Sequence, residues 1–386
     1  MTTTPPSRHV RLGTRGSPLA LWQARWVADA LRVHHPDITT EIVVLRTTGD
    51  TNRRAPLAQL GTKGLFVKEI EEALLRQDID LAVHSMKDMP TTLPPGLHFG
   101  AVPRRGEVRD AFVGRDGRRL SEIDGPWRIG TGSRRRQAQL LAMHPTLQMQ
   151  DIRGNVETRL RKMRQGEVDG LVLAATGLIR LGLQHEITEL LPLEVMLPAP
   201  GQGALALETL AGHGVDTLLA PLHDPPTASA VAAERAFLAH LGGGCMVPIA
   251  ALGQCQADVV HLQGLVSTPD SRCQWRQEIR VLRRTPCSSG NAWQNSFVPA
   301  GLVPYWKPYR DGERPRVKGH ERGSAGGADG AAYCHHQTAS AGRSLDAPVT
   351  QPGSGTSLWP GPVEKSLGVR PNRLSDSNGR VMEIFP

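Results

Sequence analysis

The chain has 386 residues, of which 45 are basic and 37 acidic, and its formal net charge is +8. This length exceeds one small core and predicts two or three domains, while the lack of an apolar run of about 18 residues argues against a membrane-spanning helix. Five cysteines, an odd number without C-x-x-C spacing, argue against a disulfide framework and against a zinc site.

The first residues and the charge distribution narrow the class of protein. Residues 1–11 are polar and contain prolines, without the apolar segment of a secretory signal, so we expect a cytoplasmic protein.

The positive charge permits nucleic acid, a membrane surface or an acidic small molecule as partner. Arginines crowd residues 104–164, but few aromatic residues lie among them, whereas single-strand binders usually supply stacking rings. A ligand with carboxylates or phosphates is therefore favoured, with neither nucleic acid nor membrane as partner.

Strands and helices alternate in the first half of the chain. Ser17 and Pro18 predict a helix start, because serine is a good N-cap and proline is favoured at the first helical position. The residues that follow helical spacing, and are expected to face the core, are Leu19, Trp22, Trp26, Ala30 and Val33. A strand at 41–47, a helix at 66–76 and a buried strand at 79–84 come next. This alternation predicts a mostly parallel sheet covered on both faces.

The pattern restarts after about residue 105. Ser133 is expected to cap a helix that runs to about residue 143. The other predicted elements are strands at 128–131 and 170–174 and helices at 157–165 and 178–183. Two similar α/β halves with a cleft between them follow from this repetition. Ligands of such folds bind at the carboxyl ends of strands.

The last third of the chain changes character. Residues 228–241 predict a helix that ends at three consecutive glycines, and residues 259–266 predict a strand. From about residue 282 onward glycine, proline, serine and arginine dominate, and apolar periodicity disappears. We expect residues 282–386 to form an atypical, disordered tail.

Three arginines, Arg134, Arg135 and Arg136, follow Ser133 at the start of a predicted helix. Cations are unfavourable at that end of a helix, whereas its free backbone N–H groups favour an anion. A bound carboxylate would resolve both problems, because arginine binds carboxylates with two parallel hydrogen bonds. The alternative is a solvated basic turn. The anion site is favoured because further arginines lie near predicted loop and helix starts. These are Arg153, Arg159 and Arg180.

Two other segments are candidates for chemistry. Lys87 and Asp88 come directly after a buried strand, where an adjacent amine and carboxylate suit acid–base or electrostatic work, although spacing alone favours an ordinary surface turn. Residues 61–64 (GTKG) resemble part of a phosphate loop, but a mobile, glycine-hinged loop over the cleft is the better interpretation. Arg15 precedes a helix start and offers another anion contact, or belongs to a simple cap.

Cys245 follows three glycines and precedes Met246, Val247 and Pro248. This loop leaves the sulfur unencumbered and lets the backbone approach a ligand closely. A lone cysteine is more often a small buried filler. The surroundings therefore raise a covalent-anchor role without establishing it.

Together these segments closely resemble the porphobilinogen deaminase (hydroxymethylbilane synthase) family. Order and spacing match the family from about residue 9 to 281. The matching motifs are TRGSPLA at 14–20, GLFVKE at 64–69, AVHSMKD at 82–88, SRRRQ at 133–137, RGN at 153–155, LPAPGQGA at 197–204 and ERAFL at 234–238.

The resemblance implies an α/β fold with two doubly wound, periplasmic-binding-protein-like domains around a cleft, plus a smaller α+β domain. The implied boundaries are 1–103 with 204–221 for the first domain, 109–197 for the second and 226–281 for the third. The implied reaction condenses four porphobilinogen molecules head to tail, releasing ammonia, into hydroxymethylbilane for haem biosynthesis. A monomer is also implied, and no metal.

The resemblance also implies roles for individual residues. A dipyrromethane cofactor would be attached to Cys245 by a thioether, and Asp88 would be the catalytic carboxylate, with Lys87 beside it. The implied cofactor-binding residues are Ser85, Lys87, Asp88, Ser133, Arg135 and Arg136. The implied substrate-binding residues are Arg15, Ser17, Arg153, Arg159 and Arg180.

The tail departs from this family. Relatives continue with another strand and a long amphipathic helix that closes the third domain, and neither is recognisable after about residue 281. We expect an incomplete third domain with an uncovered apolar face, from a shifted reading frame or an alternative end. The alternatives to an active enzyme are a catalytically impaired family member and a two-lobed anion-binding protein. A basic nucleic-acid-binding module would explain neither the Lys87–Asp88 turn nor Cys245.

Overall fold

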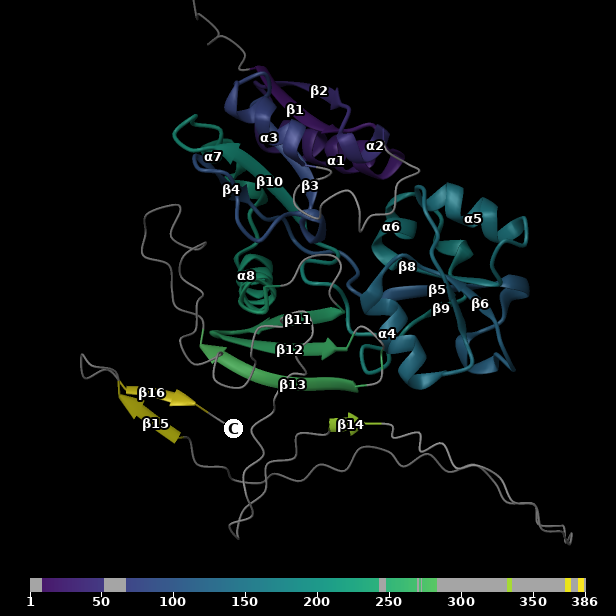
Figure 1. Cartoon of the computed structure of the whole chain (residues 1–386). Coiled ribbons are helices and arrows are strands. Elements are labelled where there is room, and N and C mark those ends of the chain that lie inside the picture. The colour runs from purple at the N-terminus through teal and green to yellow at the C-terminus, as the bar shows by residue number, and fades with distance from the viewer. Residues whose placement is uncertain are drawn as a thin grey trace, which may run out of the picture. The chain divides into compact units, whose positions relative to one another are not determined.

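The computed structural model describes residues 9–51, 67–242, 248–268, 271, 273–282, 332–334, 372–375 and 381–384. Two five-stranded sheets form the first part of the molecule (Figure 1). The first has the order β2-β1-β3-β10-β4, with β1 (His9–Arg15), β2 (Thr39–Leu45), β3 (Leu81–Ser85), β4 (Leu97–Ala101) and β10 (Leu205–Leu210). The second has the order β7-β6-β8-β5-β9, with β5 (Asp110–Gly114), β6 (Arg128–Gly130), β7 (Gln148–Gln150), β8 (Gly170–Ala174) and β9 (Glu189–Leu190).

The two sheets share one plan, which confirms the two similar α/β halves. In each, the second strand in the sheet order pairs in parallel with its two neighbours: β1 with β2 and β3, and β6 with β7 and β8. The remaining pairs are antiparallel, because β10 pairs with β3 and β4, and β5 pairs with β8 and β9. The prediction of mostly parallel sheets was therefore wrong. Each antiparallel strand enters directly from the other sheet, through residues 102–109 or 191–204, without a crossover helix of its own.

Helices cover these sheets and connect their strands. The α-helices are α1 (Pro18–His34), α2 (Thr48–Thr51), α3 (Lys68–Leu75), α4 (Arg134–Met143), α5 (Val156–Arg164), α6 (Ala175–Arg180), α7 (Asp216–Leu219) and α8 (Pro225–His240). The short 3-10 helices are η2 (Met86–Asp88), η3 (Arg115–Gly117), η4 (Leu120–Glu122), η5 (Gln184–Glu186) and η6 (Ala220–Leu222). The predicted helix at 178–183 starts three residues too late, since α6 follows β8 without a loop. No helix in the described part of the chain is long and apolar enough to cross a bilayer.

The buried side of α1 differs from the predicted one. The predicted cap is confirmed, because the Ala20 N–H donates to Ser17 Oγ at 3.3 Å and Pro18 opens the helix. The side chains that face the sheet are Gln23, Ala24, Val27, Ala28 and Leu31. Trp26 and Val33, predicted to face the core, are 39% and 77% exposed. The small Ala24 and Ala28 let the helix approach β1 and β3, and this packing selects the buried side.

A third, mostly antiparallel sheet follows α8. Its order is β11-β12-β13-β14, with β11 (Ile249–Gln256), β12 (Val259–Ser267), β13 (Cys273–Leu282) and β14 (Ala332–Cys334). Helix α8 covers one face, where Phe237 packs with Ile249 and Val260. The other face packs through Leu252 against Leu197. Among the described residues both faces of β11 and β12 thus carry packed apolar side chains, contrary to the expected bare face.

The buried carboxylate of Glu234 on α8 joins three parts of the chain. Arg105 Nη1 and Nη2 donate to its two oxygens at 2.6 and 3.0 Å. The N–H groups of Gly201 and Gly253 donate to the same carboxylate, each at 2.6 Å. Arg105 and Gly201 lie in the two segments that connect the first and second sheets, and Gly253 lies in β11. One side chain therefore fastens both connecting segments to the third sheet.

Strands β15 (Asn372–Ser375) and β16 (Val381–Ile384) pair antiparallel and belong to a second unit of the chain. Most of the predicted disordered tail lies outside the described residues, as does the predicted mobile loop at 61–64. The disorder of the tail, the incompleteness of the third domain and the three domain boundaries stay predictions.

Candidate active site

The Lys87–Asp88 turn lies at the carboxyl end of β3, as predicted. The strand ends at Ser85, and η2 carries Met86, Lys87 and Asp88 before the chain reaches Pro90. The Met86 N–H donates to the Ala204 carbonyl at 3.0 Å. The turn is therefore supported by the segment that returns from the second sheet to the first.

Gly201 and Gly203 allow that segment to come close. Gly201 has φ of 75°, and a Cβ built there would lie 2.7 Å from Met86 Cγ and 3.1 Å from the Lys87 nitrogen. Gly203 has φ of 87°, and its Cβ would lie 2.8 Å from the carbonyl oxygens of Gly106 and Glu107. Only glycine fits both the left-handed backbone and the contact. This explains the glycines of the LPAPGQGA motif physically.

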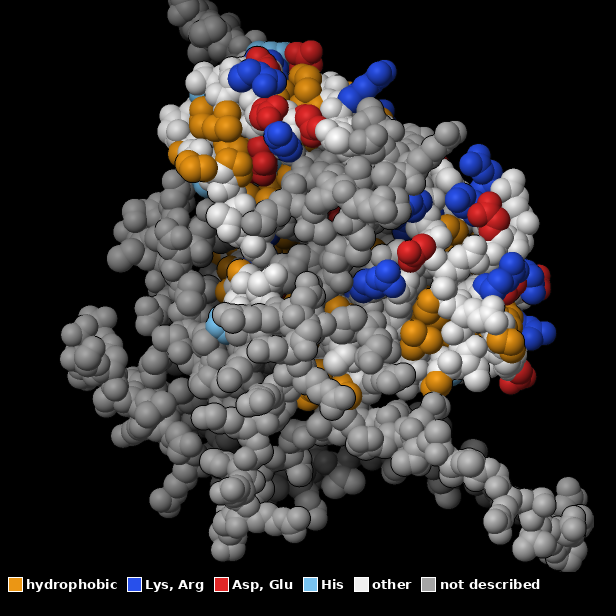
Figure 2. All heavy atoms as spheres, viewed as in Figure 1, with side chains coloured by type: hydrophobic (Ala, Val, Ile, Leu, Met, Phe, Trp, Pro, Cys, Tyr) orange, Lys and Arg blue, Asp and Glu red, His pale blue; other side chains and the backbone are white. Residues whose placement is uncertain are grey.

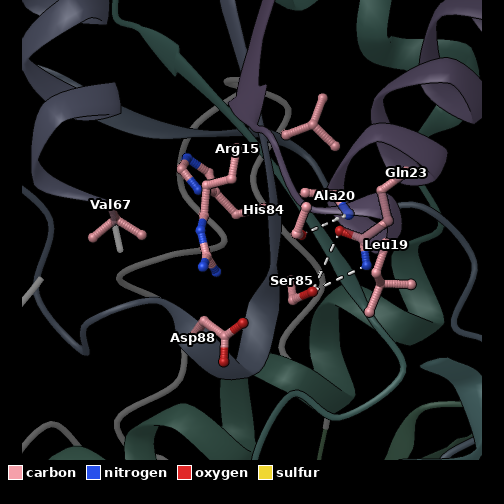
Figure 3. Close-up of a pocket in the computed structure, with 10 residues that line it drawn as sticks. Arg15, Leu19, Ala20, Gln23, Val67, His84, Ser85 and Asp88 are labelled. Atoms are coloured by element: carbon pink, nitrogen blue, oxygen red, sulfur yellow. Dashed lines mark hydrogen bonds between the residues drawn. The ribbon is translucent and has the colours of Figure 1, made fainter. Parts of the chain in front are cut away.

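A pocket opens beside the turn, between β3 and the start of α1. Residues that line it include Arg15, Ser17, Gln23, Ser85 and Asp88. Figure 3 shows the Arg15 side chain extending toward the carboxylate of Asp88. The structure thus brings together four residues predicted separately from two motifs that are about 70 positions apart in the sequence.

Gln23 is a site residue that the sequence analysis missed. It is 2% exposed, and its Nε2 donates to Ser85 Oγ at 3.0 Å, while the Ser85 hydroxyl lies 3.3 Å from Gln23 Oε1 (Figure 3). This pairing fixes the Ser85 hydroxyl at the edge of the pocket. A polar residue inside the otherwise apolar face of a helix was the available signal, but the assignment of the wrong face to α1 hid it.

Arg135 and Arg136 lie buried in the first turn of α4, and both pair with Asp110 at the start of β5. Arg135 Nη2 lies 2.8 Å from Asp110 Oδ2, and Arg136 Nη2 lies 2.7 Å from Asp110 Oδ1. Burial alone would raise the pKa of Asp110, but the two guanidiniums outweigh it and hold that pKa well below its usual range. The anion predicted beside these arginines is thus supplied in part by the protein itself.

One carboxylate does not satisfy this cationic cluster. The Nε atoms of Arg135 and Arg136 are buried and, among the described residues, have no hydrogen-bond partner. Burial lowers the pKa of Lys87 to about 8; the Asp88 carboxylate opposes this shift and Arg136 adds to it. Burial also lowers the pKa of Arg159 to about 10, again with Arg136 adding to the shift and Asp88 opposing it. Arg159 of α5 and the Lys87–Asp88 turn therefore share one electrostatic environment.

Arg180 joins the second sheet to the first. It ends α6, and its Nη2 donates to the Gly203 carbonyl at 2.9 Å, while its Cζ lies 5.6 Å from the centre of the Trp22 ring. Burial lowers the pKa of Arg180 to about 10. Together with Gln23, Ser85 and Lys87 it lines a second pocket, so residues of both sheets enclose this space.

The structure shows less about the other predicted site residues, Ser133, Arg153 and Cys245. Ser133 stands at the N-cap of α4, as predicted, but its side chain makes no capping hydrogen bond. Arg153 is half-buried in the loop before α5, whose cap is Asn155. Cys245 lies outside the described residues, in the segment between α8 and β11.

On the face seen in Figure 2, exposed basic side chains are interspersed with acidic ones. In the candidate site Arg135 and Arg136 are buried, whereas Lys87, Arg159 and Arg180 are half-buried. Guanidinium and ammonium groups in excess of the nearby carboxylates are suited to a small ligand with several carboxylates, because each carboxylate can accept paired hydrogen bonds.

Comparison with known proteins identifies the family. The model of the porphobilinogen deaminase, dipyromethane cofactor binding domain matches residues 10–215, and that of the porphobilinogen deaminase C-terminal domain matches residues 228–290. A porphobilinogen deaminase from Syntrophotalea carbinolica is 53% identical over 265 residues, which are 68% of this chain and 84% of that protein. The porphobilinogen deaminase of Trichlorobacter lovleyi is 50% identical, over 76% of this chain and 94% of that protein.

Solved structures give a more distant likeness. A TRAP periplasmic solute binding protein from Desulfovibrio salexigens aligns with 56% of this chain and 72% of that chain, at 9% identity and a TM-score of 0.33. The two family models, in contrast, cover the Asp88 turn, the arginine cluster and most of α8. The chain therefore belongs to the porphobilinogen deaminase family.

Proposed function

We propose that this chain condenses four porphobilinogen molecules head to tail into hydroxymethylbilane, with Asp88 and Lys87 as its catalytic residues. The observation that supports this best is the surplus of cations next to Asp88, formed by the buried Arg136 and the half-buried Lys87 and Arg159. Each porphobilinogen unit carries an acetate and a propionate group. A growing chain therefore accumulates negative charge, and fixed cations in one cleft stabilise it.

The family's dipyrromethane cofactor fits the residues present. Its carboxylates suit the buried Nε atoms of Arg135 and Arg136, which have no partner among the described residues. Lys87 lies in the middle of η2 and Ser133 is the N-cap of α4, and both would add donors. Ser85 and Asp88 would complete the cofactor site, with Cys245 as the thioether anchor. When bound, this group supplies the primer to which the first substrate unit is joined.

The protein residues act on the substrate as follows. In each addition the carbon–nitrogen bond of the aminomethyl group breaks, ammonia leaves, a carbon–carbon bond forms, and the attacked pyrrole carbon loses a proton. Asp88 stabilises the positive charge that develops on the substrate pyrrole and accepts or relays that proton. Lys87 supplies an ammonium whose pKa of about 8 suits proton exchange near neutral pH. The carboxylates of the substrate bind Arg15, Ser17, Arg153, Arg159 and Arg180.

Intact mass tests the cofactor and its site together. The purified protein should exceed its sequence mass by two linked pyrrole units, and Cys245→Ala should abolish that gain. Asp88→Asn should lower the rate of hydroxymethylbilane formation by about 100-fold or more, because it removes a charged catalytic group. Asp169→Asn, which changes a carboxylate paired with Arg115 and Arg128 at the edge of the second sheet, is the control.

Two results would contradict the proposal. A Cys245→Ala protein that keeps the added mass would refute the anchor, and an Asp88→Asn protein as active as Asp169→Asn would refute the catalytic role. A wild-type protein that binds polycarboxylates without forming product would be a catalytically impaired member or a two-lobed anion-binding protein.

We further propose a cytoplasmic monomer with neither nucleic acid nor membrane as partner. Light scattering of the purified protein tests whether it is a monomer.

A further inference from the structure

Arg235 of α8 holds the turn that follows Asp88. Its Nη2 donates to the Pro90 carbonyl at 2.6 Å, and its Nη1 lies 3.4 Å from the Met89 carbonyl. Its Cζ lies 5.0 Å from the ring centre of Phe99, a buried residue of β4. The guanidinium is thus fixed between an aromatic ring and the two carbonyls that come directly after η2.

The charge of Arg235 strengthens this contact. Burial lowers its pKa to about 10, and the nearby carboxylate of Glu208 opposes that shift, so the guanidinium remains charged at neutral pH. Glu208 is itself fully buried in β10, with its Oε2 at 3.1 Å from His84 Nε2 in β3. Hydrogen bonds from a charged donor to a carbonyl are stronger than neutral ones. The turn after Asp88 is therefore tied to α8 by a strong contact.

The position of Arg235 along α8 gives this contact its significance. The neighbouring residue Glu234 fastens the segments that connect the first two sheets, as described above. Helix α8 ends at His240, five residues before Cys245 in the sequence. One helix therefore reaches the Asp88 turn, the connecting segments and the start of the cysteine loop.

We infer that Arg235 is a positioning residue that holds Asp88 in its working place relative to α8. This inference rests on the function proposed above. Because catalysis is sensitive to displacements of about 1 Å, a loosened turn should slow the reaction without weakening substrate binding equally. Arg235 does not line either pocket beside Asp88, so its effect should pass through the turn.

The experiment compares Arg235→Gln with Arg276→Gln. Arg276 of β13 makes the same kind of contact elsewhere, because its Nη1 and Nη2 donate to the carbonyls of Glu194 and Leu193 at 2.8 and 3.0 Å. Each variant loses a guanidinium that holds two consecutive carbonyls, but only Arg235 holds the Asp88 turn. Both proteins are first checked by intact mass for the cofactor, and only loaded protein is assayed.

Arg235→Gln should lower kcat about tenfold with KM changed less than about twofold, whereas Arg276→Gln should change neither by more than about twofold. Amide hydrogen exchange should accelerate across residues 86–92 in Arg235→Gln and across residues 193–196 in Arg276→Gln. Arg235→Lys keeps the charge and can still donate to one carbonyl, so its kcat should lie between those of Arg235→Gln and the wild-type protein. If Arg235→Gln does not fold, Arg235→Lys replaces it in the comparison with Arg276→Gln.

Equal kcat in Arg235→Gln and Arg276→Gln would overturn the inference, as would unchanged exchange across residues 86–92. An Arg235→Gln protein that loads less cofactor but whose loaded fraction has the wild-type kcat would also overturn it, because Arg235 would then act on cofactor attachment. If the wild-type protein forms no hydroxymethylbilane, the proposed function fails instead. The exchange difference between the two variants would still show whether Arg235 holds the turn.

Discussion

At the scale of single residues, Lys87 and Asp88 are neighbours with different environments. Asp88 is exposed at the pocket, whereas Lys87 is half-buried among Asp88, Arg135 and Arg136. Burial disfavours the ammonium and lowers the pKa of Lys87 to about 8. Lys87 therefore changes its charge close to neutral pH.

This pKa predicts a pH dependence. The ammonium loses its proton as pH rises through about 8, so kcat/KM should fall on the alkaline side with an apparent pKa near 8. Lys87→Arg keeps its charge to higher pH and should move or remove that alkaline limb. The measurement is kcat/KM between about pH 6 and pH 10 for both proteins. Identical alkaline limbs would show that another group controls the decline.

The arginine cluster shows which features of the site could be predicted from neighbouring residues in the sequence and which could not. Three arginines at a helix start predicted a bound anion, because the free N–H groups and the guanidiniums both favour one, and the structure places the protein's own Asp110 carboxylate beside two of them. Asp110 precedes Arg135 by 25 positions, and no local pattern relates them. Only the insertion of β5 beside β8 places its first residue under α4.

At the scale of elements, the connecting segment before β10 supports η2 through Gly201. Alanine at this position would face both an unfavourable left-handed backbone and the contact with Met86 and Lys87. Gly212 has a similar φ of 78°, but a Cβ there would meet no described atom within 4 Å. Comparing alanine substitutions at Gly201 and Gly212 therefore separates the cost of the left-handed backbone from the effect of the contact with η2.

Gly201→Ala should lower stability by more than the roughly 1 kcal/mol expected for alanine with positive φ, and should lower kcat about tenfold. Gly212→Ala should show only the backbone cost, with unchanged kcat. Denaturant unfolding and the product assay measure both quantities. Equal effects of the two substitutions on kcat would mean that contact with η2 does not matter for the reaction.

Helix α1 shows where pattern analysis fails at this scale. Its cap and length were predictable, because Ser17 and Pro18 specify the start locally. Its buried side was not, since the tryptophans dominated the apolar pattern while the sheet selected the smaller Ala24 and Ala28. That choice also placed Gln23 under Ser85.

At the scale of the whole molecule, Glu234 holds the connecting segments and the third sheet together. Its carboxylate is fully buried and accepts hydrogen bonds from Arg105, Gly201 and Gly253. Removing one partner of a buried ion pair leaves the other charge uncompensated. Asp169 offers a comparison, because it pairs with two arginines whose side chains are 49% and 40% exposed.

Glu234→Gln should therefore lower the free energy of unfolding by about 3–5 kcal/mol. Asp169→Asn should lower it by about 1 kcal/mol, because water can solvate its half-exposed arginine partners once the carboxylate charge is removed. Chemical denaturation followed by tryptophan fluorescence measures both. Similar losses in the two variants would show that Glu234 does not join the parts of the fold in the way its contacts indicate.

The sequence by itself determined the family, the alternation of strands and helices, the cap of α1 and the turn after β3. These features depend on residues that are neighbours along the chain, or on motifs long enough to recognise. The tertiary structure alone decided that the sheets are mixed, that Asp110 neutralises two arginines, that Gln23 holds Ser85 and that Arg235 holds the Asp88 turn. Each of these contacts joins residues that only the paired strands β5 and β10, or the packing of α1 and α8, bring together.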